Sequence, residues 1–131
     1  MGDNPAKIFS LAEANQAVRK VHRFTRQVVL KVDRVRRRYG GAKEGSELPA
    51  PALNEVEELL RGWAEKVQAL GAFPKGYFTV DFQSADPGLF YCWSYGEDQI
   101  AYTHKVWENF SHRRPLVESM PVEEAHMKWV N

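Results

Sequence analysis

The chain of 131 residues contains a single cysteine, Cys92, so it cannot form an internal disulfide bond. One thiol also excludes the zinc motifs that are built from several cysteines. The longest apolar runs, such as Val28 to Leu30, are far shorter than the roughly 20 residues that span a bilayer. We therefore expect no membrane segment.

The amino terminus lacks the pattern of a secretory signal, because no apolar run follows Asp3, Asn4 and Pro5. A lone thiol suits a reducing compartment, so we expect a cytoplasmic protein. The net charge is only +1, and no whole-molecule field therefore attracts polyanions. We accordingly expect neither nucleic acid nor a membrane as the main partner.

The common enzyme signatures are missing as well. The sequence has no Gly-x-Ser-x-Gly elbow, no phosphate-binding glycine loop and no dinucleotide fingerprint. Whether the protein is an enzyme stays open at this point.

A long helix is predicted over residues 11–39. Ser10 and Glu13 have the spacing of a capping box, in which each side chain accepts a hydrogen bond from the other residue's amide. Apolar residues then recur at steps of three and four, with Thr25 at a position where the pattern expects an apolar residue. These positions are Leu11, Ala14, Val18, Val21, Val28, Val32, Val35 and Tyr39.

A second helix is predicted over residues 53–70, ending before Gly71, with the same apolar spacing. Two matching apolar faces predict an antiparallel helical hairpin. Nine lysines and arginines lie between Arg19 and Arg38, and the second helix opens with several glutamates, so the hairpin sets opposite charges side by side. These acids are Glu55, Glu57 and Glu58.

The second half of the chain has the composition of a sheet, because twelve of the sixteen aromatic residues follow Gly71. Three strands are predicted, at 77–82, 89–95 and 99–104, and turn residues between them favour an antiparallel meander over 77–104. The tail at 117–131 has the spacing of a short helix. The predicted fold class is α+β, with residues 1–131 as a single domain.

Several segments carry a family resemblance. They are Phe9-Ser10-Leu11-Ala12-Glu13-Ala14-Asn15, Val80-Asp81-Phe82, and Cys92-Trp93-Ser94-Tyr95-Gly96-Glu97 continuing through Ile100, His104 and Phe110 to Arg113-Arg114-Pro115-Leu116. In this order they resemble the uncharacterised bacterial family called domain of unknown function 2203 (DUF2203), up to Leu116. The resemblance implies a helical hairpin with a small sheet, and it brings no established activity.

A set of metal-type donors falls in and after the predicted sheet. Asp81, Cys92, His104 and Glu108 offer the oxygen, sulfur and nitrogen atoms that bind zinc or a similar divalent metal, and Glu97 is a candidate catalytic base. Their spacing matches no known ligand motif, and strand alternation alone does not require them to converge. The alternative is that they are hydrogen-bonded or solvated polar residues, with no cofactor, and that Cys92 is inert packing.

Two arginine groups raise further alternatives. Arg113 and Arg114 can clamp an anion, although pairing with acids such as Glu108 or Glu118 explains them as well. The basic residues of the first helix can track a phosphate backbone, or form a charged face neutralised by the glutamates of the second helix.

The length of the first predicted helix suggests an assembly. About 29 residues make a helix about 43 Å long, longer than a domain of this size is wide. Pairing two hairpins into a four-helix bundle buries the apolar face of the part of the helix that extends beyond the domain. We therefore expect a homodimer through the hairpin. The leading hypothesis is a self-associating scaffold or interaction module with a further protein partner. A small metal-dependent hydrolase and a nucleic-acid-binding protein are the alternatives.

Overall fold

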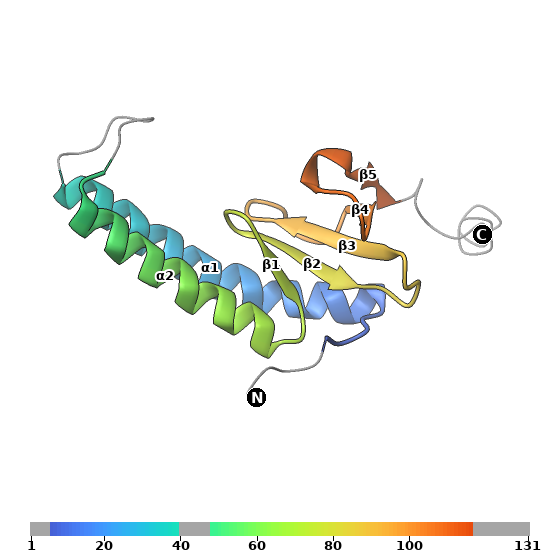
Figure 1. The fold of residues 1–131 in the computed structure, drawn as a ribbon. Coiled ribbons are helices and arrows are strands. Elements are labelled where there is room, and N and C mark those ends of the chain that lie inside the picture. The colour runs from blue at the N-terminus through green and yellow to red at the C-terminus, as the bar shows by residue number, and fades with distance from the viewer. Residues whose placement is uncertain (1–5, 40–47, 117–131) are drawn as a thin grey trace.

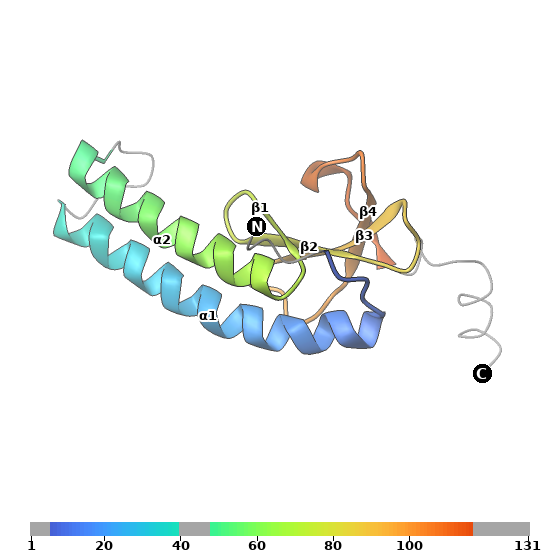
Figure 2. The same ribbon diagram turned by 60° about the horizontal axis from the view of Figure 1, so that its bottom comes forward.

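The computed structural model describes residues 6–39 and 48–116, and its fold is α+β. Helices α1 (Leu11–Arg38) and α2 (Ala50–Ala69) run side by side in opposite directions (Figures 1 and 2). Five strands follow: β1 (Phe73–Lys75), β2 (Thr79–Gln83), β3 (Leu89–Ser94), β4 (Tyr102–Lys105) and β5 (Arg114–Pro115). The 3-10 turn η1 (Phe110–His112) precedes β5.

The sheet has the order β1-β2-β3-β4-β5, with every neighbouring pair antiparallel. The predicted meander is confirmed in its topology, but the count of three strands was wrong. The two extra strands lie at the sheet edges, have two or three residues and contain Pro74 or Pro115. Proline cannot donate to a ladder and strands this short show no alternation, so neither left a strand signal in the sequence.

The predicted strand limits also shift. The first predicted strand begins at Thr79 rather than at Tyr77, because Gly76 and Phe78 adopt positive φ in the turn after β1. The third begins at Tyr102 rather than at Gln99. In the segment before it, the Ile100 amide donates to Asn15 Oδ1 at 2.7 Å, which ties this stretch to α1.

The helix predictions hold within a few residues. Both hydrogen bonds of the capping box between Ser10 and Glu13 are present. Helix α2 begins at Ala50, earlier than predicted, because Pro49 occupies the extended position before the helix and Pro51 suits a first helical turn. The predicted helix in the tail at 117–131 lies outside the described residues.

The core of the hairpin contains one polar pair. Thr25 is fully buried, and its hydroxyl oxygen accepts a hydrogen bond of 2.7 Å from the Trp63 indole N–H. At the far end of the hairpin, the Arg38 guanidinium donates to Glu55 at 2.9 Å. The predicted pairing of basic α1 with the acidic start of α2 is therefore present at this one contact.

The sheet packs against only the part of the hairpin near the start of α1 and the end of α2 (Figures 1 and 2). Its inner face contributes Val80, Phe82 and Trp93 to the core. The rest of the hairpin projects beyond the sheet, which explains why Leu53, predicted to be on the apolar face, is 47% exposed. No helix in residues 6–39 and 48–116 is both long and apolar enough to cross a membrane.

Candidate metal centre

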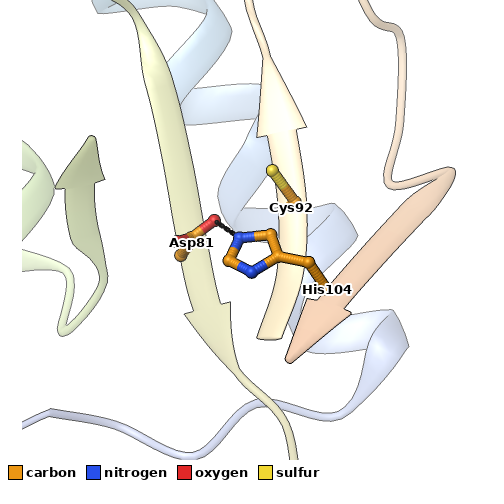
Figure 3. Close-up of side chains that lie close together, drawn as sticks. All are labelled: Asp81, Cys92 and His104. Atoms are coloured by element: carbon orange, nitrogen blue, oxygen red, sulfur yellow. Dashed lines mark hydrogen bonds and ion pairs between the residues drawn. The ribbon is translucent and has the colours of Figure 1, made fainter. Parts of the chain in front are cut away.

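Three neighbouring strands bring three of the predicted donors together. Asp81 on β2 lies directly opposite Cys92 on β3, and His104 on β4 lies opposite Phe90, two residues before Cys92. Side chains two residues apart on a strand share a face, so all three donors project from the same face of the sheet. This is the face opposite the helices, and Figure 3 shows the imidazole of His104 reaching across the strand that carries Cys92 toward the Asp81 carboxylate.

The three donors form one compact buried group. Asp81, Cys92 and His104 are at most 3% exposed, and their donor atoms lie within 4.8 Å of one another. The shortest contact joins His104 Nε2 and Asp81 Oδ1 at 3.0 Å (Figure 3). A carboxylate, a thiol and an imidazole are the side chains that bind zinc.

The imidazole of His104 is oriented by the backbone. Its Nδ1 lies 2.8 Å from the Lys105 carbonyl oxygen, and because a carbonyl only accepts, Nδ1 carries the proton. The other nitrogen, Nε2, points at Asp81 and in a neutral ring presents a lone pair. Metal-binding histidines are held in this way, with the second ring N–H donating to a carbonyl or carboxylate.

Burial raises the pKa of the Cys92 thiol to about 12, and the negative charge of Asp81 adds to the increase. Without a metal, the thiol is therefore neutral at physiological pH and is a poor nucleophile. A role for Cys92 as a free catalytic thiol therefore has no support in this environment. A bound metal ion supplies the positive charge that displaces the thiol proton.

A pocket of about 410 Å³ opens over Asp81 and His104. Its other lining residues come from the end of β1 and the turn after it, from β2, and from the segment that leads into η1 and includes its first residue. They are Lys75, Gly76, Tyr77, Thr79, Glu108, Asn109 and Phe110. Cys92 is not among the lining residues, so the thiol lies beneath the floor that the other two donors form.

Glu108, the fourth predicted ligand, lies in the pocket wall but outside the three-residue group. Arg114 donates to both of its carboxylate oxygens, at 2.8 and 2.7 Å. These hydrogen bonds, together with one from the Lys105 amide, lower the pKa of Glu108 to about 2. The side chain is thus a permanently charged partner of Arg114 at neutral pH.

Glu97, the predicted base, lies on the turn after β3 and contacts a different set of residues. Its Oε1 accepts hydrogen bonds from Arg113 Nη2 at 2.7 Å and from the Ser94 amide at 2.8 Å. Arg113 also donates to the Cys92 carbonyl oxygen at 3.2 Å. Both predicted anion-binding arginines, Arg113 and Arg114, thus pair with acids, which is the alternative that the sequence left open.

Two supporting contacts could not be predicted from the sequence. The Arg113 guanidinium packs on the rings of Tyr102 and Phe110, 4.1 and 4.4 Å from their centroids. The other is the Lys105 carbonyl that orients His104, and because it belongs to the backbone no residue type marks it.

The fold and the site define an α+β protein in which a helical hairpin packs on one face of an antiparallel sheet and buried metal-type donors occupy the other. A family model described as an uncharacterized conserved protein (DUF2203) matches residues 7–116, and the chain belongs to this family. The resemblance seen in the sequence is thereby confirmed. No curated protein and no solved structure matches the chain.

Proposed function

We propose that the protein binds a divalent transition metal through Asp81, Cys92 and His104, and that zinc is the ion its donors suit best. The observation that carries the proposal is the orientation of His104. A backbone carbonyl fixes its Nδ1 proton and leaves Nε2 directed at a carboxylate, 3.0 Å away. Two acceptors face each other across that distance unless a proton or a metal ion lies between them.

The geometry requires little movement. In a tetrahedral zinc site with bonds near 2.1 Å, an oxygen and a nitrogen ligand lie about 3.4 Å apart. Asp81 Oδ1 and His104 Nε2 therefore separate by only a few tenths of an ångström. All three donor atoms lie within 4.8 Å of one another, compared with roughly 3.6 Å between a sulfur and an oxygen or nitrogen ligand of one zinc ion, so the remaining movement is about 1 Å.

Three protein ligands leave one position of a tetrahedral zinc ion open, as in catalytic zinc sites. The pocket over Asp81 and His104 gives small molecules a route to that position. A zinc ion held there would supply Lewis-acid chemistry, so hydrolysis is the reaction class we propose. Glu108 is a weak choice as the base, because its pKa of about 2 is far below neutral pH.

The first test is elemental analysis of protein purified without an affinity-tag metal and without a chelator. The same protein is then stripped of metal, reloaded with zinc and analysed again. We expect one equivalent in the wild type and less than about a tenth of that in His104→Gln. His112→Gln is the matched control, because His112 is exposed, lies outside the three-residue group and has its ring hydrogen-bonded to Asn109. Circular dichroism checks that each variant folds.

Cobalt loading gives a second readout. Cobalt(II) bound to the Cys92 thiolate produces a sulfur-to-metal absorption band that disappears in Cys92→Ala. A wild-type protein that takes up neither metal at micromolar concentration contradicts the proposal. Metal uptake without turnover in a hydrolase screen supports the proposed metal site and contradicts the proposal that the protein is a hydrolase.

A second candidate function is self-association through the projecting half of the hairpin, as the sequence suggested. A groove of about 360 Å³ lies between the helices there, with Val35 and Leu59 at its apolar floor. Lys31 and Arg34 stand on the α1 side, and Glu58 stands on the α2 side. In a twofold arrangement of two copies, each basic wall faces an acidic wall.

Sedimentation measures this association. Arg34→Glu and Glu58→Arg are each expected to weaken the dimer at least tenfold, and the double variant is expected to restore it. Lys66→Glu, which reverses a charge outside the groove, is the control. A monomer at all concentrations refutes this candidate and leaves the metal proposal untouched.

A further inference from the structure

The outer face of α1 carries a row of exposed arginines, which we call the basic stripe: Arg19, Arg23, Arg26, Arg34 and Arg37. Successive members are separated by three, four or eight residues, so they lie on one side of the helix. That side is opposite the buried positions that pack on α2 and the sheet, such as Val21, Val28 and Val32, although Arg34 also borders the groove between the two helices. The stripe is thus a surface feature that the core does not use.

The acids of the hairpin leave most of the stripe without ion pairs. Glu55 pairs with Arg38, and Glu58 pairs with Arg61 on its own helix. Within residues 6–39 and 48–116, Arg37 forms the stripe's one ion pair, with Asp33. The expected neutralisation of the basic helix by α2 is therefore confined to the end of the hairpin.

The first three arginines of the stripe also line a shallow groove of about 440 Å³, together with His22, Gln27 and Leu30. The groove runs along α1 and contains no acidic residue among those lining it. An anion that enters meets three guanidinium groups, which bind phosphate oxygens bidentately.

We propose that the basic stripe binds the phosphate backbone of duplex nucleic acid without reading its sequence. From Arg19 to Arg37 the helix extends about 27 Å, the length over which one strand of a duplex presents about eight phosphates. Because each strand winds around the duplex axis, a straight helix meets only a few phosphates of any one strand, and a row of cations this long reaches phosphates of both strands that border a groove. The net charge of the whole chain, +1, does not oppose binding to a polyanion, because these arginines are gathered on one face.

Two other polyanion classes fit the stripe less well. Single-strand binders stack bases on exposed aromatic rings, but the groove is lined by no Phe, Tyr or Trp, and the His22 ring lies against Tyr95 at 5.6 Å. Membrane-surface helices insert an apolar face into lipid. The apolar face of α1 is instead buried in the hairpin, and Leu30 is the groove's one large apolar side chain.

The test is fluorescence anisotropy of a labelled 20-base-pair DNA duplex with the full chain, from 50 to 200 mM salt. If the four arginines without ion pairs each contact a phosphate, the salt slope is about −3.6, and affinity falls about 150-fold over this range. Arg23→Gln/Arg26→Gln removes two contacts and should reduce the slope by about 1.8.

The matched control is Arg61→Gln/Lys66→Gln, which makes the same change in net charge on exposed positions of α2. It should keep the wild-type slope. Equal losses in the two double variants would mean that total charge alone drives binding, and would overturn the proposal. An absence of duplex binding at 50 mM salt, or tighter binding of a single strand of the same length, would also overturn the proposal. So would a loss of binding to anionic vesicles in Arg23→Gln/Arg26→Gln that equals the loss of duplex binding in the same variant.

Discussion

Replacing Thr25 by valine tests the polar contact at the centre of the hairpin. Thr25 and Trp63 are 0% and 2% exposed, and the 2.7 Å hydrogen bond between them satisfies the indole N–H. Valine keeps the shape of threonine but removes the acceptor. An unpaired buried donor costs about 1–3 kcal/mol, whereas the added methyl group contributes at most about 0.8 kcal/mol. We expect Thr25→Val to lower the free energy of unfolding by about 1–2 kcal/mol.

Thr103 provides a control with the opposite expected sign. It is also fully buried, but its hydroxyl oxygen has no hydrogen-bond partner in the part of the chain that the structure describes. Thr103→Val makes the same chemical change and removes an unsatisfied group. We therefore expect this variant to be as stable as the wild type, or more stable by up to about 1 kcal/mol.

Urea unfolding followed by far-UV circular dichroism measures both variants under identical conditions. The difference between their unfolding free energies should be about 1–3 kcal/mol in favour of Thr103→Val. Equal stabilities would refute the reasoning, because they would show that the hydrogen bond between Thr25 and Trp63 contributes nothing beyond the packing of the two side chains.

Two further predictions concern ionisation. The pKa of Glu108 is lowered to about 2 from an ordinary value of 4.5, so its pairing with Arg114 stabilises the fold above that ordinary value and is lost as pH falls toward 2. Between about pH 5 and pH 3, the urea midpoint of the wild type should therefore fall more steeply than that of Glu108→Gln. The Cys92 thiol of metal-free protein, with its pKa of about 12, should not react with a thiol reagent at neutral pH until urea is added, and rapid labelling of the folded chain would contradict its burial.

Local signals made the helices predictable. The capping box fixed the start of α1, and the spacing of apolar residues identified the face that α2 covers. Thr25 interrupted that spacing, and the interruption proved informative, because a polar residue on a buried face needs a partner and Trp63 supplies it. The edge strands escaped prediction because Pro74 and Pro115 remove the usual strand pattern.

The candidate metal centre was predictable in its residues but not in its geometry. Asp81, Cys92 and His104 stood out as donor types, yet their convergence depends on the register of two strand pairs, and sequence alone does not fix a register. Glu97 and Glu108 have the same chemistry, and the structure directs them to Arg113 and Arg114 instead. What separates the two groups is long-range pairing, which leaves no trace in local spacing.

The three donors converge only when β2 and β3 pair in their native register, so an intact site indicates a correctly folded sheet. If β3 slipped by one residue against β2, every one of its side chains would change faces, and Cys92 would turn toward the helices. Trp93 would leave the core in the same movement. A chain able to hold a metal ion at Asp81, Cys92 and His104 has therefore aligned all three strands, so metal uptake would count properly folded molecules in a mixed population.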